Sequence, residues 1–284
     1  MPTPQPGILL PLPPLCRYLV FSLEPDTDVA AGLTALRQVA DGEHTVAGIG
    51  QAPLSAIGRK LPGLKPFPPL SGPGIDIPST PAALWLWLRG DDRGELLLRS
   101  RHIEQALAPV FRLQESCDGF KHDTGRDLTG YEDGTENPTG EAATAAAIAA
   151  DGSSLVAVQR WLHNFSRFDA MQPEDRDNCI GRRRSDNEEL DDAPESAHVK
   201  RTAQESFSPE AFLLRRSMPW ADGMEAGLMF VAFGHTLDAF QAQMRRMIGL
   251  EDGIVDALFR FTRPVSGAYF WCPGMEGGQL QLPV

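Results

Sequence analysis

The sequence predicts a mixed α+β fold built from two related modules. An apolar strand pattern at 16–25 is followed by a helical pattern at 26–40, and the same order of strand, short polar break and amphipathic helix returns at 226–249. One strand-helix unit in each half is typical of α+β modules whose sheet is covered by helices on one face. The 284 residues are long enough for one large domain or for two smaller ones.

The segments between these units supply the remaining elements. In chain order we expect a strand and a helix within 80–107, a loosely structured Ala-rich stretch at 141–153, a strand at 154–163, a helix at 171–184 and a polar loop at 185–201. The helix at 171–184 has Pro173 at its first position and acidic residues in its first turn, both of which favour a helix N-terminus.

Composition excludes several classes of protein. The chain has 26 Lys and Arg against 38 Asp and Glu, a net charge of -12, which repels phosphate backbones and argues against nucleic acid as a partner. The four cysteines lie far apart and form no CxxC pair, so we expect free thiols in a reducing cytoplasm. The apolar N-terminal run is broken by prolines and has no basic residue before Arg17, and no long apolar stretch follows, so we expect neither a secretory signal nor a membrane span.

An unusual loop, "GYEDGTENPTG" at 130–140, holds an acid between glycines. Gly130 and Gly134 permit backbone conformations closed to other residues, and they leave Asp133 with little steric cover. From the residue types alone, the loop is either a common surface Asx turn or a functional loop that presents Asp133 to a flat ligand. The six histidines show no HxxxH or HxH spacing, so no metal site is evident from local sequence.

Four blocks in a fixed order resemble the B-type (class P) dye-decolourising peroxidases. They are "GYEDGTENP" at 130–138, "IGRRRSDNEELDDAPESAHVKR" at 180–201, "LLRRSMPW" at 213–220 and "DALFRFTRPVSGAYFWCP" at 256–273, and a weaker likeness covers the N-terminal part. The resemblance implies duplicated ferredoxin-like modules that form a haem peroxidase like the dimeric α+β barrels. We expect residues 1–140 to form the first module, which ends in the GxxDG loop, and 141–284 to form the second.

The resemblance also implies the reaction and the cofactor. The chain is expected to bind haem b non-covalently, in keeping with the lack of a CxxCH motif, to reduce hydrogen peroxide and to oxidise bulky aromatic one-electron donors such as dyes and phenols. The alternative is a haem-binding protein for haem or iron handling with incidental peroxidase activity. A haem-free hydrolase that uses Asp133 and Glu136 as acid and base is a third hypothesis.

Five residues are expected to act closest to the iron. His198 matches the axial ligand of the family, and Asp256 is the candidate acceptor for the second ring nitrogen of His198. Asp133 matches the acid that moves a proton between the two peroxide oxygens. Arg215 matches the arginine whose fixed charge favours the ionised carboxylate, and Ser217 is expected to hold a water on the same side.

Other residues are expected at the haem edge and along an electron path. Arg182 matches a position that pairs with a haem propionate, and Asn137, Thr135 and Gly134 are expected to touch the haem edge. Apolar walls are expected from Phe230, with Leu228 and Phe259 as further candidates. Aromatic residues that could carry an electron are Tyr131, Trp161, Trp220, Tyr269 and Trp271.

The expected assembly is a free homo-oligomer in the cytoplasm. Many relatives carry a C-terminal tail that directs them into encapsulin shells, and the final "GMEGGQLQLPV" shows no such extension. Encapsulin targeting is therefore not expected.

Overall fold

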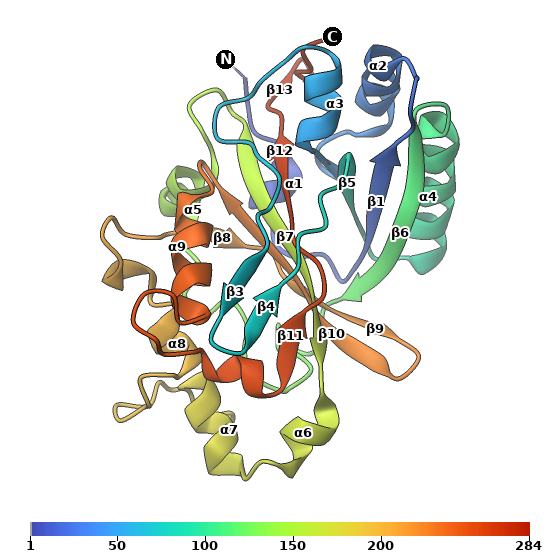
Figure 1. Cartoon of the computed structure of the whole chain (residues 1–284). Helices are drawn as coiled ribbons and strands as arrows, with labels where there is room; N and C mark the ends of the chain where they lie inside the picture. The colour runs from blue at the N-terminus through green and yellow to red at the C-terminus, as the bar shows by residue number, and fades with distance from the viewer. Residues whose placement is uncertain (1) are drawn as a thin grey trace.

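A closed antiparallel β-barrel forms the centre of the computed structural model, which describes residues 2–284 (Figure 1). Within these residues eight strands follow one another around the barrel in the order β7-β12-β2-β5-β1-β6-β9-β10, and β10 pairs with β7. Helices lie outside the barrel, so the predicted α+β class is confirmed.

The N-terminal half contributes four barrel strands. Its elements are α1 (Pro6–Leu9), β1 (Leu15–Leu23), α2 (Val29–Val39), β2 (Thr45–Ile49), α3 (Gln51–Ala56), β3 (Leu70–Gly72), β4 (Ile75–Ile77), β5 (Leu84–Gly90), α4 (Arg93–Leu107) and β6 (Phe111–Phe120). The predicted helix at 26–40 begins behind an acidic cap, because the Asp28 carboxylate accepts a hydrogen bond from the Ala31 amide at 3.0 Å.

The C-terminal half contributes the other four barrel strands. Its elements are α5 (Gly140–Ala147), β7 (Ser154–His163), α6 (Phe165–Ala170), α7 (Pro173–Ile180), α8 (His198–Arg201), the 3-10 turn η1 (Gln204–Ser206), β8 (Leu214–Arg215), β9 (Met218–Asp222), β10 (Glu225–Gly234), α9 (Asp238–Met247), the 3-10 turn η2 (Ala257–Arg260), β11 (Thr262–Pro264), β12 (Ala268–Cys272), β13 (Met275–Glu276) and β14 (Gln279–Leu280).

Both halves use the same strand order. The N-terminal sheet runs β6-β1-β5-β2 and the C-terminal sheet runs β12-β7-β10-β9, so the fourth strand of each half lies beside its first, and the third lies beside its second. Each first and each third strand is followed by helix, which gives the ferredoxin-like β-α-β-β-α-β pattern twice. The halves meet at two narrow seams, the pairs Gly119–Trp220 and Ile49–Trp271.

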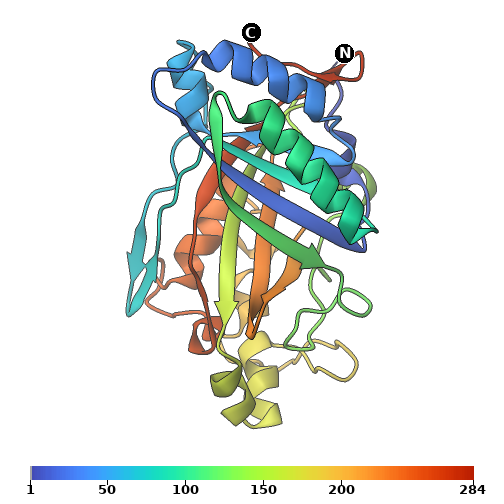
Figure 2. The same cartoon turned by 90° about the vertical axis from the view of Figure 1, so that its right-hand side faces the viewer.

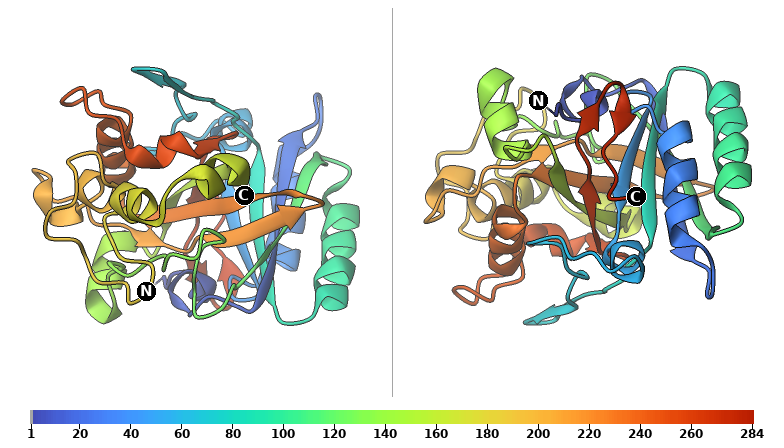
Figure 3. Two further views of the ribbon diagram at one scale, coloured as in Figure 1. Left: turned by 90° about the horizontal axis from the view of Figure 1, so that it is seen from below. Right: turned by 90° about the horizontal axis from the view of Figure 1, so that it is seen from above.

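Strand alternation divides the apolar core into an inner and an outer layer. Even-numbered Val156 and Val158 of β7 belong to a cluster that draws side chains from all eight barrel strands and faces the lumen. Odd-numbered Leu155 and Ala157 belong to the outer cluster. The helices α2 and α4 cover the outside of the N-terminal half, and α9 covers the outside of the C-terminal half on the opposite side of the barrel (Figures 2 and 3).

Two predicted elements differ from the structure. The Ala-rich stretch expected to be loose forms α5, because alanine has the highest helix propensity and Ala143, Ala146 and Ala147 are buried on one side of the helix. The predicted helix at 171–184 ends at Ile180, because Gly181, at φ 92°, adopts the left-handed conformation that terminates α7. The segment at 185–201 is a loop until its end, where α8 begins at His198.

The described helices include none that combines the length and the apolar character needed to cross a membrane. Cys16, Cys117, Cys179 and Cys272 are all buried and free, as predicted.

Candidate functional site

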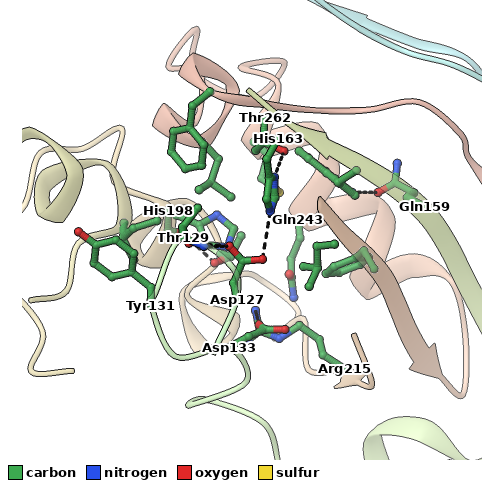
Figure 4. Close-up of a pocket in the computed structure, with 18 of the residues that line it drawn as sticks. Asp127, Thr129, Tyr131, Asp133, Gln159, His163, His198, Arg215, Gln243 and Thr262 are labelled. Atoms are coloured by element: carbon green, nitrogen blue, oxygen red, sulfur yellow. Dashed lines mark hydrogen bonds and ion pairs between the residues drawn. The ribbon is translucent and has the colours of Figure 1, made fainter. Parts of the chain in front are cut away.

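Two adjoining hollows lie on the outer face of β7 and β10, where α7, α8, α9 and the loop at 122–137 close over the sheet. Figure 4 shows residues that line the first of them. The first is mostly apolar, with Leu228 and Phe230 from β10 facing Met244 and Met247 from α9. The second is more polar and includes Thr135. His198, Asp133 and Arg215 line both hollows. The two hollows therefore form one candidate site, which we call the outer cavity.

His198 stands at the first position of α8 with one ring nitrogen already bonded. Its Nδ1 lies 2.7 Å from Asp256 Oδ2, and the other oxygen of Asp256 accepts the Leu258 amide at 2.8 Å. Asp256 is almost fully buried, so its carboxylate is fixed as an acceptor. The Nδ1 proton then stays on the ring, and Nε2 is left as a lone-pair donor with no hydrogen-bond partner within residues 2–284.

Asp133 and Arg215 form the charged pair of the outer cavity. Asp133 Oδ1 lies 4.0 Å from Arg215 Nη1, which is close enough for attraction without a direct hydrogen bond. Burial raises the pKa of Asp133, the Arg215 charge lowers it and the Asp127 charge raises it again, so that the pKa lies above its ordinary value. The Asp133 carboxylate is therefore a stronger base than an exposed one and takes up a proton more readily.

Asn137 holds the backbone of Arg215 in place. Its side-chain oxygen accepts the Arg215 amide at 2.8 Å, and its side-chain nitrogen donates to the Arg215 carbonyl at 3.0 Å. Gly134, at φ 78°, turns the loop here, and any Cβ on it would press against the Asn137 amide. We expected Asn137 at the haem edge, but both of its polar groups are used on Arg215, and it does not line the outer cavity.

A chain of three side chains lines the same cavity and was missed from the sequence. His163 is buried at the end of β7, with Nε2 3.0 Å from Asp127 Oδ1 and Nδ1 2.7 Å from Thr262 Oγ1 (Figure 4). Burial raises the pKa of Asp127, but hydrogen bonds from His163 and Thr129 outweigh it, and the pKa lies below its ordinary value. The odd-numbered alternation of β7 could have placed His163 on the cavity side, but no pattern linked it to Asp127.

Tyr131 ties the loop of Asp133 to α7. Its hydroxyl donates to Asp177 Oδ1, and its ring is 5% exposed and packs with Phe168 and Phe261. Burial and the neighbouring carboxylate both raise the pKa of Tyr131. Tyr131 is therefore a buried aromatic residue that also anchors the loop through a hydrogen bond.

Arg182 lies at the polar end of the outer cavity but is already paired. Its Nη2 lies 2.6 Å from Glu136 Oε1 and 2.8 Å from Glu189 Oε2. Both carboxylates are more than half exposed, with side chains 67% and 55% accessible, so either could move into water at small cost. Thr135 lies beside them and accepts a hydrogen bond from Asn187 at 3.0 Å.

The remaining expected residues divide between the cavity and the core. Phe230 and Leu228 line the outer cavity, whereas Phe259 packs on Trp161 at a ring distance of 5.4 Å and does not line it. Ser217 is buried, its oxygen accepts the Val231 amide at 3.3 Å, and it does not line the cavity either. Ser217 therefore supports the β10 backbone, because its oxygen already accepts the hydrogen bond from Val231.

The aromatic residues considered for electron transfer are all buried. Trp161 lines the outer cavity, and its carbonyl accepts the Trp220 indole N–H at 3.0 Å. The Arg160 guanidinium stacks 3.7 Å from the Trp220 ring centre. The positive charge of Arg160 destabilises a radical cation on the indole ring. Trp220 is therefore poorly suited to give up an electron. Tyr269 and Trp271 face the outer core.

A haem group fits this set of donors. A histidine with a free Nε2 faces an apolar cavity, an acid and an arginine share that cavity, and Gln159 Nε2 lies in its wall as a buried donor without an acceptor in the described part of the chain. The polar end at Arg182 can receive carboxylates.

Comparison with known proteins identifies several relatives. Residues 124–277 match the family model "Dyp-type peroxidase, C-terminal". A dye-decolorizing peroxidase of Rhodococcus erythropolis is 31% identical over 95% of this chain and 86% of its own length, and one of Mycobacterium tuberculosis is 27% identical over 96% and 89%. Among solved structures, a dye-decolorizing protein from V. cholerae is 28% identical with a TM-score of 0.86, over 94% of this chain and 96% of its own. A variant of DypB from Rhodococcus jostii RHA1 in complex with heme is 27% identical with a TM-score of 0.85, over 94% and 95%.

Proposed function

The chain belongs to the Dyp-type peroxidase family and is a haem peroxidase acting on dyes, and on this premise we propose which of its residues do the work. The resemblance to the B-type branch is confirmed by the likeness to DypB. The proposed cofactor is haem b, held without a covalent bond, and the proposed substrates are hydrogen peroxide and bulky aromatic one-electron donors.

His198 is the proposed iron ligand. Asp256 holds Nδ1–H at 2.7 Å, which turns Nε2 toward the cavity and increases its electron donation to a metal. Bound there, haem supplies the redox chemistry, that is, cleavage of the peroxide and storage of the two oxidising equivalents. Arg182 is proposed to receive a propionate in place of Glu136 or Glu189, since both are exposed. Thr135, Gly134 and Phe230 are proposed to lie against the haem edge.

Asp133 and Arg215 are proposed to act on hydrogen peroxide. The Asp133 carboxylate takes the proton from one peroxide oxygen and returns it to the other as the oxygen–oxygen bond breaks, and a well-placed acid-base group of this kind accelerates a reaction by roughly 100- to 10,000-fold. Arg215 favours the ionised carboxylate and stabilises negative charge that develops on peroxide. The observation that carries the proposal is that this pair and the free Nε2 of His198 line one cavity.

The deciding experiment is anaerobic mixing of haem-loaded protein with peroxide in a stopped-flow spectrometer, followed by addition of an aromatic donor. We expect Asp133→Ala and Arg215→Leu to retain haem but to slow the first change of the haem spectrum. Undiminished rates in both variants would remove the pair from the mechanism.

Two proposals concern organisation. We place the boundary between modules at residue 140, which is supported by the repeated strand order on either side. We also propose a cytoplasmic homo-oligomer. Reduced, buried cysteines suit the cytoplasm, and the exposed side chains of Leu97 and Leu98 on α4 give a surface for self-association. Light scattering coupled to gel filtration measures the oligomer size, and a monomer would contradict the proposal.

A further inference from the structure

A second cavity lies inside the barrel. It has a volume of about 400 Å³ and opens at the end where β1 and β6 diverge from the C-terminal half. Its inner wall consists of apolar side chains that face the lumen, among them Val158, Met229 and Phe270. Its mouth is formed by residues 80–82, 114–115 and 265–266. We call it the lumen cavity.

The lumen cavity and the outer cavity share one wall. Along β7, Gln159 and Trp161 face the outer cavity, whereas Val158 and Arg160 face the lumen cavity. The same alternation on β10 gives Met229 to the lumen cavity. A molecule in the lumen is therefore separated from the outer cavity by the thickness of one sheet, although no described side chain lines both.

The side chains that line the lumen cavity suit an aromatic ring that carries a hydroxyl group. Trp85 and Phe270 stack with ring centres 6.2 Å apart and form a flat apolar surface. At the mouth, Arg160 and Glu115 form an ion pair at 2.9 Å that crosses from one half of the barrel to the other. This pair gives the cavity one carboxylate and no excess charge, so a neutral ring with a hydroxyl donor fits better than an anion.

Two features of this region are not explained by a purely structural role of the Arg160–Glu115 ion pair. Arg160 Nε and Trp85 Nε1 are buried donors in the cavity wall with no acceptor among residues 2–284, and buried donors are normally paired. The close packing typical of protein interiors would also fill a space of about 400 Å³ with side chains.

We propose that the lumen cavity binds a small phenol as an electron donor to the haem site, a proposal that rests on the function argued above. The phenol O–H bond breaks, the proton passes to the Glu115 carboxylate, and one electron crosses β7 to the outer cavity, where the peroxidase reaction consumes it. The product is a phenoxyl radical, and two phenols are oxidised for each peroxide reduced. The donor thus never enters the outer cavity.

Binding is tested by equilibrium dialysis of 4-methylphenol against resting haem-loaded protein. We expect saturable binding that Ala82→Phe, which fills the cavity mouth, weakens by about tenfold or more, equivalent to about 1.4 kcal/mol. Ala30→Phe on the exposed face of α2 is the matched control and should bind as the parent does. Equal binding by both variants would overturn the proposed site.

The role of Glu115 is tested by turnover with two donors. Glu115→Gln should lower kcat/KM for 4-methylphenol by about tenfold or more, because the proton acceptor is lost. Ferrocyanide gives up an electron without a proton, so its turnover should change less than about twofold. Glu24→Gln is the control, since Glu24 pairs with Arg112 outside the cavity at 2.8 Å. If Glu115→Gln lowers kcat/KM equally for both donors, the proposal is overturned. If the parent protein does not oxidise ferrocyanide at all, the result instead contradicts the proposed function.

Discussion

The hydrogen bond between His198 and Asp256 is the most constrained interaction of the site. The carboxylate is buried, and it is bonded at the same time to the imidazole and to the Leu258 amide, at 2.7 and 2.8 Å. A buried, ionised acceptor gives the histidine more anionic character than a neutral one, which stabilises the higher oxidation state of a bound metal.

Asp256→Asn is therefore expected to raise the midpoint potential of the bound haem. We expect a shift on the order of 60 mV, which for one electron is a tenfold change in the equilibrium. Spectroelectrochemical titration of haem-loaded protein measures it. Asp41→Asn is the control, because Asp41 also pairs with a histidine, His44 at 3.1 Å, but on the surface. An unchanged potential would show that Asp256 is only structural.

Because the pKa of Asp133 is raised, the ionised Asp133 carboxylate is expected to destabilise the folded chain. The folded pKa lies above the ordinary 3.8, so the folded chain binds the proton more tightly than the unfolded chain. This destabilisation is absent at pH values below the ordinary pKa of the carboxyl group, and it is fully present above the pKa that Asp133 has in the folded chain. Asp133→Asn should accordingly raise Tm at pH 7 by about 2–4 °C for each kcal/mol relieved, and the gain should shrink as the pH falls toward 4. Thermal scans across that range test it, and a lower Tm at pH 7 would contradict the prediction.

At the scale of elements, the loop at 122–137 is held from two sides. Tyr131 binds Asp177 of α7, and Asp127 binds His163 of β7. Since these partners lie on elements that bound the cavity, the position of Asp133 follows from packing between α7 and β7 rather than from the loop alone. The ionised Asp127 also raises the pKa of Asp133 through its charge.

Asp127→Asn should move the acid limb of the kcat/KM profile for peroxide to lower pH. Loss of the negative charge lowers the pKa of Asp133, so the ionised form persists in more acidic solution. Steady-state kinetics of haem-loaded protein between pH 3 and 7 provide the measurement. Asp118→Asn serves as the control because Asp118 pairs with Arg17, outside the cavity. An unchanged acid limb would show that the charge of Asp127 does not act on Asp133.

At the scale of the whole molecule, the two halves share one inner core although, within residues 2–284, only two residue pairs join their strands. Side chains from all eight barrel strands meet in the lumen, so neither half can keep its inner face buried without the other. The ion pair between Arg160 and Glu115 adds a contact between the halves.

We therefore expect one cooperative unfolding transition in calorimetry of haem-loaded protein, despite the repeated strand order. The reason is that separation of the halves would expose the apolar lumen. Residues 1–140 expressed alone should bind a hydrophobic dye such as ANS, as partly unfolded proteins do. Two well-separated transitions would mean that each half is stable by itself.

Some features could be predicted from the sequence because they depend on local order. Alternation in 154–163 determines which side chains of β7 face each side of the sheet, and the strand-helix units determine the α+β class. The motif blocks identified His198, Asp133 and Arg215, which the structure brings to one cavity. The helix α5 was missed because the prediction gave too little weight to the propensity of its alanines and could not include their burial.

Other features were decided only by the tertiary structure, because they depend on which distant backbones meet. Asn137 looked like a ligand contact, but the approach of β8 makes it the clamp of Arg215. His163 and Asp127 are 36 residues apart and carry no joint pattern, yet barrel closure makes them partners. The lumen cavity opens where β6 and β9 separate after one residue pair. The packing of the two sheets determines where these strands separate, and no single segment of the sequence does.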